Sequence, residues 1–74
     1  MDRVVFDYSK LHGRIREKIG TQKEFAKSMG LSPATVTAKL SSKSWFDQPE
    51  IYRAIDILGI DPMDITTYFF TQKI

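Results

Sequence analysis

A helical period of apolar residues runs through the middle of the chain and predicts a short helix from Gln22 to Met29. Phe25, Ala26 and Met29 share one face of this segment, and the charged residues between them lie on the other side. A helix with one apolar face packs against a core and leaves its polar face in solvent.

Both ends of this helix carry their own signals. Thr21 has a side-chain oxygen that can cap the N-terminus, and Glu24, three positions later, completes the pattern of a capping box. Gly30 ends the helix, because glycine adopts the left-handed conformation without a Cβ clash. Leu31 then offers the hydrophobic contact that is common at such helix ends.

A second helix is expected to begin directly afterwards. Ser32 is a typical N-cap and Pro33 suits the first helical position, where a missing N–H is tolerated. Val36 and Leu40, four residues apart, point into a core. The outer face carries small side chains, namely Ala34, Thr37, Ala38 and Ser41. The two segments together predict a helix-turn-helix motif over about residues 21–41.

Three further helices are expected around this motif. One starts at Asp7 or Ser9 and runs to about Ile19, with an apolar face formed by Tyr8, Leu11, Ile15 and Ile19. Another starts near Asp47 and ends at Gly59. A fifth, short helix covers about residues 62–68, after the cap and proline of the Asp-Pro pair at 61–62. The expected fold is all-α, with five helices in one domain of residues 1–74.

The chain ends are rich in β-type residues. Val4, Val5 and Phe6 suit a short strand or an arm, and the tail YFFTQKI is aromatic and β-branched. The tail is suited to pairing with Arg3 to Phe6 or with a second subunit. A short terminal β-pair therefore stays open beside the five helices.

Several local features leave alternatives open. Trp45 and Phe46 are adjacent aromatics that favour a lid on the core over a platform for stacking bases. Gly13 lies inside the first helix, where close helix packing is one explanation for it. A row of basic residues on that helix either meets phosphates or is merely solvated; it consists of Lys10, Arg14 and Lys18.

Charge is distributed unevenly along the 74 residues, although the net charge is only +2. Between positions 10 and 43 there are eight basic and two acidic residues, and outside that window there are three basic and seven acidic residues. The positive part contains the predicted motif and would attract a polyanion. Solvated helix faces explain the charge pattern equally well, and the presence of the motif favours the polyanion.

The composition excludes several classes of function. There is no cysteine, and the single histidine, His12, has no second ligand at metal-binding spacing, so no metal site and no cofactor are expected. No catalytic constellation or glycine-rich phosphate loop is present, which argues against an enzyme. No segment has the length of a membrane span or the character of a signal peptide, so a cytoplasmic location is expected.

Six residues of the central segment lie at the recurrent positions of a known family: Gln22, Ala26, Gly30, Ser32, Val36 and Leu40. In these residues the chain resembles the lambda-repressor-like, or Cro-like (XRE-type), helix-turn-helix family. The flanking segments FDYSKLHGRI and YFFTQK extend the resemblance to small phage or prophage regulators. An αα-hairpin within an unrelated small bundle is the alternative.

The resemblance implies a small transcriptional regulator that binds operator DNA in a lysogeny/lysis switch. In that family the first helix of the motif crosses the DNA backbone and the second lies in the major groove. The DNA-facing positions are occupied here by Thr21, Gln22, Lys23, Ser32, Pro33, Ala34, Thr35, Thr37, Ala38, Lys39, Ser41 and Lys43. Double-stranded DNA is the implied partner, and a homodimer is a further possibility.

The groove-facing residues also support a second hypothesis. Discrimination of bases by paired hydrogen bonds needs Arg, Lys, Asn or Gln, whereas this face offers hydroxyl and methyl groups. A small, partly apolar face suits contact with a protein as well. Some small phage proteins with this fold are antirepressors, or modulators of repression, which bind the DNA-reading surface of a repressor. The sequence favours operator binding and keeps antirepression as the alternative.

Overall fold

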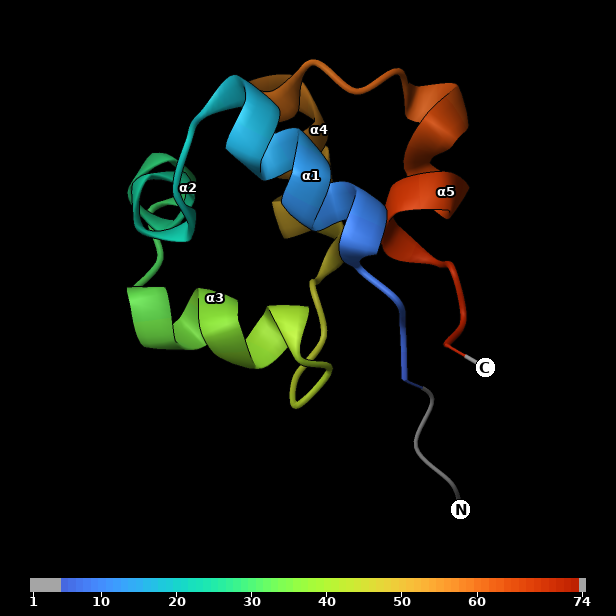
Figure 1. The fold of residues 1–74 in the computed structure, drawn as a ribbon, viewed down its shortest axis with the longest axis horizontal. Coiled ribbons are helices and arrows are strands. Elements are labelled where there is room, and N and C mark those ends of the chain that lie inside the picture. Colours follow the sequence, from blue (N-terminus) through green and yellow to red (C-terminus); the bar gives the residue numbers. More distant parts are fainter. Residues whose placement is uncertain (1–4, 74) are drawn as a thin grey trace.

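Helices account for most of residues 5–73, the part of the chain that this computed structural model describes. The elements in order are α1 (Ser9–Lys18), α2 (Gln22–Met29), α3 (Pro33–Leu40), α4 (Gln48–Leu58), the 3-10 turn η1 (Pro62–Asp64) and α5 (Ile65–Phe69). In Figure 1, α1 lies centrally, with α2 on one side and α5 on the other, and α3 runs below them. The predicted all-α fold of five helices is confirmed, and the short last helix is divided into η1 and α5.

Local signals set the helix ends. The Thr21 hydroxyl accepts a hydrogen bond of 3.1 Å from the backbone N–H three residues later, at the start of α2. A reciprocal capping box forms instead at the start of α4, between Asp47 and Glu50. Gly30 and Gly59 end α2 and α4 with φ angles of 73° and 63°.

The core is built from the faces that the apolar pattern predicts. Phe25, Ala26 and Met29 of α2 are buried, as are Val36 and Leu40 of α3. Side chains from α1, α4, α5 and the connections complete the same cluster: Tyr8, Leu11, Ile15, Phe46, Ala54, Ile55, Leu58, Ile60 and Phe69. A single core therefore fixes the relative positions of all five helices.

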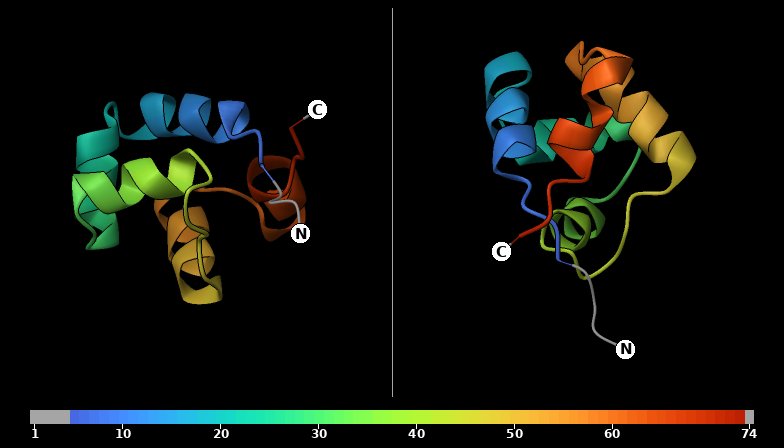
Figure 2. Two further views of the ribbon diagram at one scale, coloured as in Figure 1. Left: turned by 90° about the horizontal axis from the view of Figure 1, so that it is seen from below. Right: turned by 90° about the vertical axis from the view of Figure 1, so that its right-hand side faces the viewer.

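The segment before α1 and the tail after α5 run side by side (Figure 2). Phe6 and Gln72 form an isolated antiparallel bridge, and the backbone N–H of Asp7 donates to the carbonyl of Thr71 at 2.7 Å. The sequence left open a β-pair between the segment from Arg3 to Phe6 and the tail, and the structure shows a single bridge there. The first two residues of that segment lie outside the described part of the chain.

Two expectations about individual residues are wrong. Gly13 does not serve close helix packing, because it is exposed and a Cβ added there would meet no atom within 4 Å. Trp45 is not a full part of the core lid, since 44% of its surface remains exposed, whereas its neighbour Phe46 is buried. The two adjacent aromatics therefore have different environments.

Candidate functional site

The outer face of α3 is held by hydrogen bonds within the domain. Gln22 of α2 donates from Nε2 to the Thr37 hydroxyl at 2.9 Å, which joins two of the predicted DNA-facing residues. Ser32 caps α3, and its hydroxyl also lies 2.8 Å from that of Thr35. Ser41 donates its hydroxyl hydrogen to a backbone carbonyl of α3. The hydroxyl groups expected to read DNA are therefore already engaged internally.

The exposure of this face agrees with its predicted orientation. Pro33, Ala34 and Thr37 are exposed, and Ala38 is half-buried. Thr21, Lys23, Ser41 and Lys43 are exposed as well. The side chains on this face are small, as the sequence indicates.

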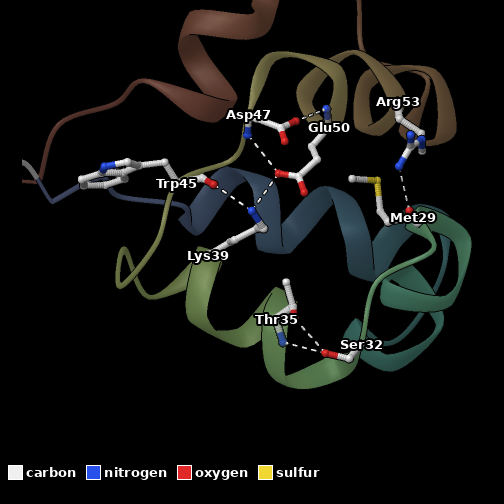
Figure 3. Close-up of polar contacts among 8 residues, drawn as sticks. All are labelled: Met29, Ser32, Thr35, Lys39, Trp45, Asp47, Glu50 and Arg53. Carbon is white, nitrogen blue, oxygen red and sulfur yellow. Dashed lines mark hydrogen bonds and ion pairs between the residues drawn. The ribbon is translucent and has the colours of Figure 1, made fainter.

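Lys39 lies elsewhere than the sequence predicts. It was expected to flank a DNA-reading face, but its side chain is buried among α3, the following loop and α4. Its Nζ donates to the Trp45 carbonyl at 2.8 Å and lies 2.8 Å from Oε1 of Glu50 (Figure 3). The assignment of Lys39 to a phosphate contact is therefore wrong, since its charge and donors are used inside the protein.

Two arginines also bind carbonyl groups at helix ends. Arg14 donates to the carbonyls of Leu58 and Gly59 at 2.9 and 3.0 Å, at the C-terminus of α4. Arg53 donates to the Met29 carbonyl at 2.9 Å, at the C-terminus of α2 (Figure 3). Cations near helix C-termini are favourable because of the partial negative charge there. Of the basic row on α1, for which phosphate contact and solvation were both left open, Arg14 is therefore engaged within the domain.

A second candidate surface is an apolar hollow of about 360 Å³, which we call the aromatic hollow. It is lined by Phe6, Tyr8, Trp45, Phe46, Ile51, Phe69 and Phe70. Trp45 and Phe70 at its rim are 44% and 48% exposed. Phe6 meets both of these rings edge to face, with centroids 5.7 and 5.8 Å away. An exposed group of aromatic side chains of this kind is typical of a surface that binds another protein.

Buried polar contacts hold two walls of the aromatic hollow. Ser42 is only 3% exposed, and its hydroxyl accepts a hydrogen bond of 3.1 Å from the backbone N–H of Phe6. Lys39 holds the carbonyl of Trp45, as described above. The sequence did not indicate either anchor, because both join parts of the chain whose proximity depends on the fold.

Other kinds of site find little support among the described residues. No group of three or more His, Cys, Asp or Glu side chains in residues 5–73 is arranged to hold a metal ion. None of the helices in that range has both the length and the apolar character needed to cross a membrane.

Comparison with known proteins identifies the family. The pattern described as "Protein of unknown function (DUF739)" matches residues 4–72. The chain belongs to this family. No curated protein matches it. Among solved structures, it is similar to the solution structure of the modulator of repression (MOR) of the temperate bacteriophage TP901-1 from Lactococcus lactis. The two chains are 48% identical, the match covers 88% of each, and the TM-score is 0.76. This member of the DUF739 family therefore resembles a small phage regulator of repression.

Proposed function

We propose that this protein is an antirepressor, which binds the DNA-binding domain of a phage repressor and so prevents operator binding. The observation that carries this proposal is the 48% identity, over 88% of both chains, to a protein named a modulator of repression. This was the alternative in the sequence analysis, and the similarity supports it better than operator binding by the chain itself. On this proposal the protein acts by binding alone and needs no cofactor.

The aromatic hollow is the surface that we assign to the repressor. Its rim presents the exposed rings of Trp45 and Phe70, and aromatic anchors supply much of the binding energy at protein interfaces. The outer face of α3 suits this partner less well. A repressor's DNA-reading surface is positively charged because it binds phosphates, and two exposed lysines of α2, Lys23 and Lys27, lie beside Pro33 at the start of the α3 face. Like charges would oppose their approach.

A gel-shift experiment tests the proposal. It uses an operator fragment from the DNA flanking the gene, the repressor encoded beside it, and this protein. We expect no shift with this protein alone and a loss of the repressor's shift when it is added in stoichiometric amount. A direct shift of the operator by this protein alone, together with an unchanged repressor shift, would contradict the proposal.

Operator binding by a lambda-repressor-like helix-turn-helix is the second candidate. It is favoured by the exposure of Lys23 and Lys43 and of Ala34 on the outer face of α3. Against it, Lys39 and Arg14 are bound within the domain, so fewer cations are available for phosphates. A salt dependence of any direct DNA binding, with loss of affinity in Lys23→Ala, would support this candidate.

A further inference from the structure

A buried ion pair lies behind the aromatic hollow. Lys39 comes from α3 and Glu50 from α4, and their side chains are only 11% and 12% exposed, with Nζ and Oε1 2.8 Å apart. Moving two charges out of water is costly, and a buried pair is often no more stabilising than apolar residues of the same size. Its contribution to overall stability is therefore a weak explanation for this arrangement.

The contacts of the pair are concentrated on three consecutive residues of the loop before α4. Lys39 Nζ donates to the carbonyl of Trp45 at 2.8 Å and lies 5.9 Å from the centre of the Phe46 ring. Glu50 Oε1 accepts from the backbone N–H of Asp47 at 2.9 Å (Figure 3). The pair thus contacts the backbone carbonyl of Trp45, the ring of Phe46 and the backbone N–H of Asp47.

Two of these loop residues form part of the aromatic hollow. Trp45 supplies a half-exposed ring at its rim, and Phe46 supplies a buried ring that meets Tyr8 and Phe69 edge to face, at 5.8 and 5.4 Å. Phe46 is buried among these rings, whereas Trp45 is 44% exposed and meets the Phe6 ring edge to face at 5.7 Å. The contact from Lys39 acts on the backbone carbonyl of Trp45 and so fixes the backbone from which this half-exposed ring projects.

We propose that Lys39 and Glu50 are positioning residues that fix the Trp45 segment, so that the aromatic hollow is preformed before a partner binds. A preformed surface loses less conformational entropy on association than one that must be ordered first. The part of this proposal that concerns the repressor rests on the proposed function. The part that concerns the position of Trp45 does not, and it is tested separately.

The test uses the double variant Lys39→Met/Glu50→Gln. Methionine preserves the length and the burial of the stem, and glutamine keeps an oxygen for the N–H of Asp47, so the domain is expected to fold. Glu50→Gln alone is a second variant: it keeps Lys39 and an oxygen acceptor, but it leaves the buried lysine without its counter-charge. Lys27→Met is the matched control, because it removes a lysine from an exposed position of α2. Cooperative unfolding in urea establishes that each variant is folded.

Trp45 is the only tryptophan of the chain, so its fluorescence reports directly on this segment. In the double variant we expect stronger acrylamide quenching of Trp45 and a red-shifted emission. The affinity for the repressor should be about tenfold weaker, which corresponds to the loss of one positioning hydrogen bond. Glu50→Gln is expected to give smaller changes in the same direction, and Lys27→Met no change. A merely structural role would alter the unfolding transition without altering the fluorescence of the folded state.

Unchanged quenching in the folded double variant overturns the proposal, as does increased quenching with unchanged repressor affinity. If the unmodified protein does not bind the repressor at all, the proposed function fails instead. The quenching measurements then decide whether Lys39 and Glu50 position Trp45, independently of any partner.

Discussion

The hydroxyl of Ser42 accepts a hydrogen bond from the backbone N–H of Phe6 at 3.1 Å. Ser42 has a φ angle of 62°, in the left-handed region that residues with a side chain rarely adopt, and it is buried. The backbone strain at Ser42 is thus accompanied by a contact that attaches the segment before α1 to the loop after α3. One wall of the aromatic hollow depends on this bond.

Ser42→Ala is therefore expected to lower the free energy of unfolding by about 1–3 kcal/mol, because it leaves the N–H of Phe6 without its acceptor. Ser42→Gly also removes the hydroxyl but relieves the left-handed strain, so it should cost less. Urea unfolding of both variants measures the difference. Equal stability of Ser42→Ala and the unmodified protein would show that the bond contributes nothing.

Gly13→Ala is expected to stabilise the protein by about 0.5–1 kcal/mol. Gly13 lies in the interior of α1, it is exposed, and an added methyl group would meet no atom within 4 Å. Alanine reduces the conformational freedom of the unfolded chain without a clash in the folded one. The melting temperature should rise, and a decrease would contradict the open surroundings of Gly13.

Leu40→Ala is expected to cost about 2–5 kcal/mol, because the residue is 8% exposed and belongs to the core. This is a large part of the stability of so small a domain. Leu31→Ala, at a half-buried position between α2 and α3, is the matched control and should cost less. Denaturant unfolding compares the two, and a Leu40→Ala variant with unchanged stability would contradict the packing of α3.

The two candidate surfaces differ in their response to substitution. Trp45→Ala is expected to weaken repressor binding by about 2 kcal/mol or more, as for an aromatic anchor at an interface. Ala34→Glu, on the exposed face of α3, should leave repressor binding unchanged but abolish any direct DNA binding by charge repulsion. Isothermal titration and gel shifts measure the two activities. The reverse result would assign the repressor to α3.

Asp7 makes a contribution to stability that depends on pH. Hydrogen bonds from the Ser9 hydroxyl and from the Ser9 backbone N–H lower the pKa of the Asp7 carboxyl group from its usual value. The unfolded chain has the higher pKa, so this stabilisation is present above the unfolded value and is lost as the pH falls through the folded pKa. As the pH is lowered from neutral to about 2, the free energy of unfolding should fall less in Asp7→Asn than in the unmodified protein. Parallel urea titrations test this, and identical pH profiles would contradict it.

The helices were predictable because their signals are local. Thr21, Ser32 and Asp47 cap helices within three residues of themselves, and Gly30 and Gly59 end helices through their own backbone conformation. The buried faces followed from the helical spacing of apolar residues. None of these features requires knowledge of the tertiary fold.

The site was less predictable because its contacts are not local. A lysine such as Lys39 ordinarily lies at the surface, and only the approach of α4 brings Glu50 to it. Arg14 and Arg53 likewise find their carbonyl partners 44 and 24 residues away. Trp45 was expected to lie in the core together with Phe46, but only Phe46 is buried, and Trp45 remains 44% exposed.

The bridge between Phe6 and Gln72 also has a consequence for the order of folding. Contacts between distant parts of a chain form late, because closing a long loop costs entropy before any contact is gained. The aromatic hollow takes walls from both ends of the chain, so we expect it to be completed after the helical core and to open before the core does. The backbone N–H groups of Asp7 and Lys73, which donate to the carbonyls of Thr71 and Val5, should therefore exchange their hydrogens faster than that of Val36. The surface assigned to recognition would then be fixed at the Trp45 segment, which Lys39 and Glu50 hold, and less protected where residues 5–7 meet residues 71–73.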